Sequence, residues 1–294
     1  MTGEHAAPPR ILVTGAGGYV GRHVVRALLD RGAHVVAADR SAATRTVPHD
    51  PRATLAAVDV FDAQQATPEV LGHPDVVVHL AWEAGFQHGS PAHMARLSDH
   101  YTFLRRMVAS GTRQLAVAGT MHEVGYHEGE IDATTPTRPQ TLYGVAKDAL
   151  RRSLEIELAG QDVVLQWLRC FYIYGDDGAN SSIFTKIAQA EARGDARFPF
   201  TSGTNRFDFI DVAELGAQIA ATALQRQETG IINCCSGTAV PLRDRVEAFI
   251  AENGFRIRLE YGAYPDRPFE SPAVWGNADA IRRIMDRDRQ PAGS

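Results

Sequence analysis

Seven residues near the start of the chain decide its fold: Gly15-Ala16-Gly17-Gly18-Tyr19-Val20-Gly21. A short apolar run, Ile11 to Thr14, precedes them, and apolar residues recur at helical spacing over Val20 to Leu29. The pattern predicts a strand, a tight turn and a helix, with glycines where the backbone turns sharply or approaches a ligand. The unpaired amide groups at the helix N-terminus would then face a pyrophosphate. A glycine-rich turn without a ligand is the alternative.

Further apolar runs of strand length alternate with polar or helical segments along the first half of the chain. A helix is expected from about Tyr143 to Ala159. The runs expected to form strands are Val35 to Ala38, Ala56 to Val60, Val76 to Ala81, Leu115 to Gly119 and Val163 to Phe171. Alternation of this kind predicts a Rossmann-type, doubly wound parallel α/β sheet with helices on both faces.

The character of the sequence changes after Gly175, where a polar loop and a proline- and glycine-bearing segment begin. We therefore expect a smaller, discontinuous C-terminal lobe for the substrate. Residues 1–175 would form the dinucleotide-binding core, and residues 207–236 would return to it. Residues 176–206 and 237–294 would form the lobe. The polar N-terminus, Met1 to Arg10, lacks the apolar centre of a signal peptide and is expected to be a frayed leader.

Composition and charge exclude several classes of protein. The hydrophobic share of 44% and charged share of 22% are those of an ordinary globular protein, and no apolar stretch is long enough to span a membrane. A net charge of −5 without a basic, aromatic-bearing run argues against nucleic acid as a partner. Neither the eleven histidines nor Cys170, Cys234 and Cys235 show the spacing of a metal site or a disulfide framework. A cytoplasmic location is expected.

The residues that end the strands suggest a nicotinamide cofactor. Asp39 ends the second strand, where its carboxylate can accept hydrogen bonds from an adenosine ribose and repel a 2′-phosphate, which favours NAD. Arg40 follows and could instead pair with that phosphate, so NADP stays possible. Trp82 could line the pocket or serve only in packing. The cofactor-binding candidates are Gly15, Gly18, Tyr19, Val20, Gly21, Asp39, Arg40, Asp59, Val60, Leu80, Ala81, Trp82 and Lys147.

A second motif, Tyr143-Gly-Val-Ala-Lys147, points to proton transfer. A tyrosine and a lysine four residues apart lie on one face of a helix, which brings the ammonium close to the phenol. A phenol ionises near pH 10 unaided, and a neighbouring cation favours the phenolate. The pair alone is a weak indication, but after a Rossmann fingerprint it predicts an active site.

Over nearly its whole length the sequence resembles the extended short-chain dehydrogenases, the family of NAD-dependent epimerases, dehydratases and ketoreductases. The resemblance rests on TGAGGYVG at Thr14 to Gly21, HLA at His79 to Ala81, PxxPxxxYGxxK over Pro136 to Lys147, and a strand ending in Tyr174-Gly175. It implies a third catalytic residue, Thr120, whose hydroxyl would bond the reacting oxygen. It also implies a homodimer, packed through the helices about Ala92 to Ala109 and Tyr143 to Ala159.

Departures from the family pattern bear on the substrate. Met121 and His122 follow Thr120 where 4,6-dehydratases carry Asp-Glu, so dehydration is disfavoured. Tyr172 and Phe207 replace the usual Asn and Arg, with Arg206 one place earlier. His122 could instead be a loop histidine, and the arginines plain surface residues. The substrate-binding candidates are His122, Tyr172, Asn180, Arg206 and Arg267.

Two functions follow from the resemblance, and a third, from a different class, is the alternative to them. The run Phe198 to Asp211, with Pro265 to Phe269 and Ser271 to Trp275, resembles a subgroup that acts at C4 of dTDP-linked 6-deoxy sugars. The first function is therefore NAD(P)-dependent reduction or oxidation at C4 of a nucleotide-linked 4-keto-6-deoxy sugar. The second is a nucleotide-sugar 4-epimerase with tightly bound NAD, and the third a regulator that binds the dinucleotide without turnover.

Overall fold

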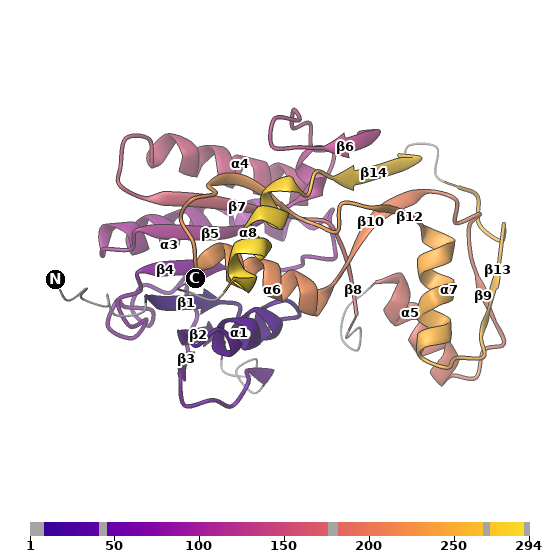
Figure 1. Ribbon diagram of the computed structural model, residues 1–294, viewed down its shortest axis with the longest axis horizontal. Helices are drawn as coiled ribbons and strands as arrows, with labels where there is room; N and C mark the ends of the chain where they lie inside the picture. The colour runs from indigo at the N-terminus through magenta and orange to yellow at the C-terminus, as the bar shows by residue number, and fades with distance from the viewer. Residues whose placement is uncertain (1–8, 41–45, 176–181, 267–270, 291–294) are drawn as a thin grey trace.

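The core is a seven-stranded parallel sheet in a computed structural model that describes residues 9–40, 46–175, 182–266 and 271–290 (Figure 1). The strand order is β3-β2-β1-β4-β5-β7-β11, the 3-2-1-4-5-6 order of a doubly wound sheet with one further strand. Its members are β1 (Arg10–Thr14), β2 (His34–Asp39), β3 (Ala53–Ala57), β4 (Val76–His79), β5 (Gln114–Thr120), β7 (Val164–Cys170) and β11 (Gly230–Cys234). The predicted Rossmann-type fold is confirmed.

Two layers of helices cover the two faces of this sheet because its strands are apolar on both sides. Ile11 and Val13 of β1 share a buried cluster with α1 and α6. Leu12, whose side chain points to the opposite face, shares another cluster with α3 and α4. These helices are α1 (Gly21–Asp30), α6 (Val212–Ala223), α3 (Leu97–Ala109) and α4 (Leu142–Glu157).

The smaller lobe lies at the opposite end of the molecule from β3 (Figure 1). One sheet has the order β12-β10-β14-β6, with β8 paired to β10, and a second consists of β13 and β9. Their strands are β6 (Gly129–Ile131), β8 (Tyr172–Tyr174), β9 (Arg197–Pro199), β10 (Arg206–Asp211), β12 (Ala239–Pro241), β13 (Arg258–Glu260) and β14 (Ala273–Gly276). The lobe's helices are α5 (Ile183–Ala192) and α7 (Leu242–Glu252), which pack with these sheets around phenylalanines.

The division of the chain between core and lobe differs from the one that the sequence indicated. β10 was expected to return to the core, but it pairs with β8, β12 and β14 and so belongs to the lobe. The short β6 and β8, from the range assigned to the core, lie in the same sheet. Conversely, α8 (Asp279–Arg289), from the range assigned to the lobe, packs on α6 and β11 of the core. Only α6 and β11 of residues 207–236 return to the core.

Two further differences concern element boundaries. The third strand was expected at Ala56 to Val60, but β3 begins three residues earlier, since its parallel register pairs Ala53 with Val35 and ends at Ala57 opposite Asp39. The helix expected over Ala92 to Ala109 is two helices, α2 (Ala92–Ala95) and α3. No helix in the described ranges is long and apolar enough to cross a bilayer.

Candidate functional site

A cavity of about 840 Å³ opens at the carboxyl end of the core sheet, between the core and the lobe. Its volume is that of a small-molecule or cofactor site. Every residue predicted to bind the cofactor lines it, from the glycines after β1 to Lys147. Thr120 and Tyr143 line it as well. The sheet therefore brings both motifs, which are far apart in the sequence, to one hollow.

The glycine turn fits tightly because it has no side chains where the backbone crowds. Gly15 has a φ of +68°, and a Cβ at this position would lie 2.7 Å from the backbone nitrogen of Ala81. A Cβ at Gly21 would lie 2.0 Å from the carbonyl oxygen of Gly15. Val20, the N-cap of α1, makes no side-chain capping hydrogen bond. The start of this helix is thus unoccupied by a capping side chain and faces the cavity.

Asp39 binds the glycine turn and faces the cavity at the same time. One carboxylate oxygen accepts a hydrogen bond from the backbone nitrogen of Gly17 at 2.9 Å, and the other accepts from the backbone nitrogen of Arg40 at 2.8 Å. Asp59 and Val60 lie in the loop after β3 and line the same end of the cavity. This end therefore presents a fixed carboxylate beside the basic side chain of Arg40.

Tyr143 and Lys147 reach the cavity from the first turns of α4. Thr141 caps this helix by accepting a hydrogen bond from the backbone nitrogen of Gly144. A Cβ at Gly144 would lie 2.5 Å from the carbonyl oxygen of His122, so glycine is needed for α4 to pack this closely. Lys147 Nζ donates to the carbonyl oxygen of Ala118 at 2.6 Å. The close packing sets Tyr143 beside the end of β5.

Burial sets the ionisation of both groups. Desolvation raises the pKa of Tyr143 well above its usual value, and a side-chain hydrogen bond with Thr120 acts against this rise. Desolvation lowers the pKa of Lys147 to about 7, while the charge of Glu123 acts in the opposite direction. The phenol thus stays protonated at neutral pH, as a proton donor would.

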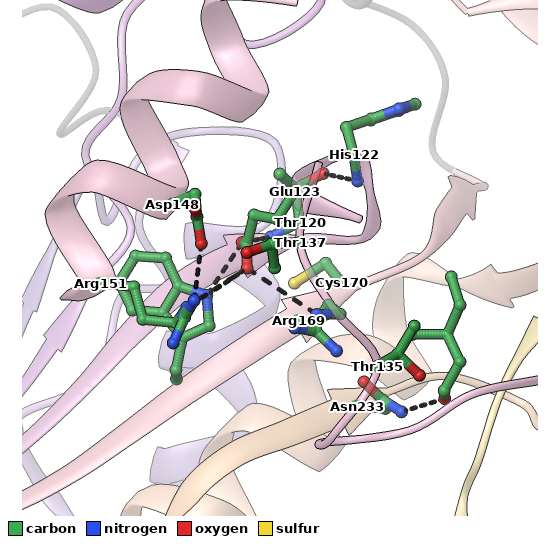
Figure 2. A network of polar contacts seen from close by, with 12 residues as sticks. Thr120, His122, Glu123, Thr135, Thr137, Asp148, Arg151, Arg169, Cys170 and Asn233 are labelled. Carbon is green, nitrogen blue, oxygen red and sulfur yellow. Dashed lines mark hydrogen bonds and ion pairs between the residues drawn. The ribbon is translucent and has the colours of Figure 1, made fainter. Parts of the chain in front are cut away.

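The buried carboxylate of Glu123 holds the backbone of Thr120, the third predicted catalytic residue (Figure 2). The next three residues form a 3₁₀ turn, η2 (Met121–Glu123), and Thr120 Oγ1 accepts a hydrogen bond from the backbone nitrogen of His122. Glu123, fully buried, accepts from the backbone nitrogen of Thr120 at 2.6 Å and from Trp167 Nε1 at 2.9 Å. The guanidinium groups of Arg169 and Arg151 approach the same carboxylate at 3.8 and 3.9 Å.

The predicted substrate-binding residues are only partly brought together. His122 and Tyr172 line the cavity. Arg206 does not, because its guanidinium donates to the carbonyl oxygen of Ala239 on the exposed side of β10. Asn180 and Arg267 lie outside the described residues. Among the described residues, no group of three or more histidines, cysteines or acidic residues is placed to hold a metal ion.

Several cavity residues were not predicted from the sequence. His88 stacks on the ring of Tyr143 with centroids 5.0 Å apart, and its own ring lies 4.3 Å from that of His122. The loop that carries His88 has no periodicity or motif to identify it. Cys170 and Phe171 also line the cavity. Their position just after β7 is a usable indication, because ligands bind at the carboxyl ends of parallel strands.

The chain matches a known family and curated proteins. The model of the NAD dependent epimerase/dehydratase family matches residues 11–235. The chain is 42% identical to dTDP-6-deoxy-L-talose 4-dehydrogenase (NAD(+)) of Aggregatibacter actinomycetemcomitans, over 90% of this chain and 98% of that protein. It is 26% identical to UDP-glucose 4-epimerase of Azospirillum brasilense, over 97% of this chain and 88% of that protein.

Solved structures share the fold. A UDP-N-acetylglucosamine 4-epimerase from Methanobrevibacter ruminantium superposes with a TM-score of 0.81 at 18% identity, covering 95% of this chain and 92% of that one. A dTDP-glucose 4,6-dehydratase from Streptomyces venezuelae with NAD bound gives a TM-score of 0.76 at 20% identity, covering 97% of this chain and 92% of that one.

Proposed function

Because the chain belongs to the NAD dependent epimerase/dehydratase family, we propose that it is an oxidoreductase acting at C4 of a nucleotide-linked 6-deoxy sugar. The observation that carries this proposal is the single cavity shared by the glycine turn, Tyr143 and Lys147. A dinucleotide held by the turn and a sugar held by the lobe would meet beside the phenol. The named relatives act on nucleotide sugars, which supports the substrate class.

The residues at the glycine end fit NAD. The backbone of Gly15 to Gly21 and the start of α1 would hold the pyrophosphate, and Asp39 would accept hydrogen bonds from the adenosine ribose. The nicotinamide, when bound, supplies or accepts the hydride. Arg40 favours a 2′-phosphate at this end, and Asp39 opposes it by charge repulsion.

Tyr143 is the proposed proton donor in the reductive direction and the acceptor in the oxidative one. On reduction of a 4-keto group, the phenol would give its proton to the sugar oxygen while the carbon receives the hydride. The ammonium of Lys147 would stabilise the phenolate left behind. Thr120, bonded to Tyr143 and anchored through Glu123, would hold the sugar oxygen in line with the phenol.

The lobe side of the cavity supports a substrate with flat or apolar surfaces. Tyr172 and Phe207 lie with ring centroids 4.6 Å apart, and Phe209 adjoins both rings. All three line the cavity, and an aromatic wall suits a nucleobase or a 6-deoxy sugar. Together with the 42% identity to the 4-dehydrogenase, this wall favours a dTDP-linked 6-deoxy sugar.

A stoichiometric assay tests the proposal. The protein is incubated with dTDP-6-deoxy-L-talose and NAD, and NADH absorbance and the sugar products are followed together. We expect NADH to form in proportion to the 4-keto sugar. Conversion of a nucleotide sugar into its C4 epimer without net NADH would make the protein a 4-epimerase instead. Binding of NAD without turnover of either kind would favour the regulator.

A further inference from the structure

The side chain of Lys147 lies against the face of Trp82, the residue three places after the end of β4. Lys147 Nζ is 3.6 Å from the centroid of the Trp82 ring, and only 3% of Lys147 is exposed. We propose that Trp82 is a positioning residue that holds the Lys147 side chain in place and keeps it as an ammonium through a cation–π contact. The inference deepens the proposed function, on which it rests, by giving the lysine of that site its partner.

Lys147 has few other partners for its charge. An ammonium has three donors, and the structure gives this one a single hydrogen bond, to the carbonyl oxygen of Ala118 at 2.6 Å. No carboxylate of the described residues lies within ion-pair distance of it. The ring of Tyr143, at 5.9 Å, is farther away than that of Trp82. Indole is the most favourable aromatic face for a cation, above all where water is excluded.

Trp82 is fixed at its edge by a histidine. Its Nε1 donates to Nδ1 of His93 at 3.0 Å. Because an indole N–H can only donate, Nδ1 of His93 must accept, so its ring proton sits on Nε2. His93 Nε2 in turn donates to the carbonyl oxygen of Gln87 at 2.9 Å. The chain from Gln87 through His93 thus sets the orientation of the indole.

A second histidine fixes the face of the indole. His100 stacks on Trp82 with ring centroids 4.1 Å apart and planes 18° from parallel. Nδ1 of His100 lies 2.9 Å from Nε2 of His79, and Nδ1 of His79 lies 2.8 Å from Oγ1 of Thr14. Thr14, His79 and His100 are all buried. The aromatic platform is therefore anchored to β1, β4, α2 and α3, and it does not depend on one mobile side chain.

The other ionisable groups near Lys147 are Tyr143 on the same helix, Cys170 on β7, Glu123 on η2, His79 on β4 and His100 on α3. The charge of Glu123 favours the ammonium, but its carboxylate lies beyond ion-pair distance and is shared by Arg169 and Arg151. Burial raises the pKa of Tyr143 and raises that of Cys170 to about 12, so both are neutral near pH 7. Burial lowers the pKa of His79 to about 3 and lowers that of His100 as well, so neither histidine competes with the ammonium.

The sequence makes this lysine easy to observe, because the protein has only two lysines, Lys147 and Lys186. The full-length protein is labelled with [¹³Cε]lysine, and both ¹³C resonances are titrated by NMR, with Lys186→Arg used for assignment. Lys186 lies exposed on α5 and serves as the internal control. We expect Trp82→Leu to lower the titration midpoint of Lys147 by about one pH unit. Trp82→Phe should lower it by less, and Lys186 should not move.

The sign of the shift separates this role from simple packing. If Trp82 only filled space, its loss would admit water, relieve desolvation and raise the midpoint of Lys147. A raised or unchanged midpoint in Trp82→Leu overturns the proposal. Should that variant fail to fold, the decision passes to Trp82→Phe, where an unchanged or raised midpoint has the same consequence.

The measurement does not need turnover, so it is independent of the proposed activity. A lowered midpoint in a protein that fails to oxidise the sugar nucleotide would support the platform and reject the proposed function. In an active protein, the alkaline limb of the pH profile of kcat/KM should move by the same amount in the same direction. A lowered midpoint with an unmoved alkaline limb would overturn the assignment of Trp82 as a positioning residue for catalysis.

Discussion

At the residue scale, the oxygen of Tyr143 is the atom on which the proposed chemistry depends. Tyr143→Phe removes that oxygen and leaves the ring contacts with His88 and Trp82 in place. We expect folding and NAD affinity to survive while turnover falls by on the order of a hundredfold or more. Initial rates with the sugar nucleotide and fluorescence titration of NADH check both parts. Near-normal turnover would reject Tyr143 as the proton donor, and His122 would be tested next.

Two further variants at the same site should lower turnover to different extents. Lys147→Ala should be at least as harmful as Tyr143→Phe, because it removes the cation beside the phenol and a contact expected with the cofactor ribose. Thr120→Val should be milder, since it removes one hydrogen bond and leaves the proton donor. A Thr120→Val enzyme slower than Tyr143→Phe would contradict this order.

Asp39 is the residue expected to set the choice of cofactor. Its carboxylate is held by Gly17 and Arg40, so it cannot easily turn away from a 2′-phosphate. We expect NADH to bind more tightly than NADPH, and Asp39→Ala to narrow the difference by about tenfold, the effect of about 1.4 kcal/mol. Calorimetric titration of both cofactors measures this. Equal or reversed preference in the unmodified protein would mean that Arg40 dominates.

The sequence singled out those cavity-lining residues that belong to local motifs. The glycines, Tyr143 and Lys147 are recognisable because their spacing is fixed by one turn or one helix. His88 and Cys170 were missed, because their nearness to Tyr143 arises only when separate segments fold together. Arg206 was expected to reach the cavity and does not, for the converse reason. Its position beside an aromatic strand suggested the cavity, but the strand directs it to the carbonyl oxygen of Ala239.

At the scale of elements, the short turn η2 depends on one buried carboxylate. Glu123→Gln would keep one oxygen as the acceptor for the N–H groups of Thr120 and Trp167, but it would place an amide donor opposite Arg169 and Arg151 and remove their shared anion. We expect the free energy of unfolding to fall by about 3 kcal/mol, measured in urea.

The matched control for this turn is Glu155, whose carboxylate pairs with the same Arg151 but is 44% exposed. Glu155→Gln should change the free energy of unfolding by less than about 0.5 kcal/mol. Turnover should also fall in Glu123→Gln, because loss of the shared anion weakens the support of the turn that positions Thr120. Equal stability of the two variants would show that burial of Glu123 does not matter for the turn.

Hydrophobic periodicity predicted whether a segment forms a helix or a strand better than it predicted the sheet to which a strand belongs. The parallel strands are apolar on both faces, which gives a clear run of residues, and their order follows from the alternation with helices. β10 has the same apolar character, but its partners β8, β12 and β14 are short strands without a sequence pattern of their own. A strand cannot be assigned to one of two sheets when its partners are unrecognised.

At the scale of the whole molecule, the two lobes share segments of the chain, so the cavity lies where the chain crosses between them. β7 of the core ends at Cys170, and β8 of the lobe begins at Tyr172. Both residues line the cavity. A change in the angle between the lobes would therefore act directly on the substrate side. The sequence indicated a discontinuous lobe, but it did not indicate that the short strands β6 and β8 belong to the lobe's sheet.

The homodimer implied by the family resemblance stays a prediction, and α4 offers a way to test it. Ile156 on its outer side is 79% exposed, whereas Leu150 and Leu154 of the same helix are buried. In a two-fold dimer the interface would contain Ile156 from both protomers. Ile156→Glu would therefore place two carboxylates in it and should weaken association by on the order of a hundredfold or more. Light scattering at micromolar concentration should show a dimer for the unmodified protein and a monomer for Ile156→Glu. Tyr264→Glu, at a residue 56% exposed in the lobe, is the control and should stay dimeric. A monomeric unmodified protein would reject the dimer, and a dimer that tolerates Ile156→Glu would place its interface away from this face of α4.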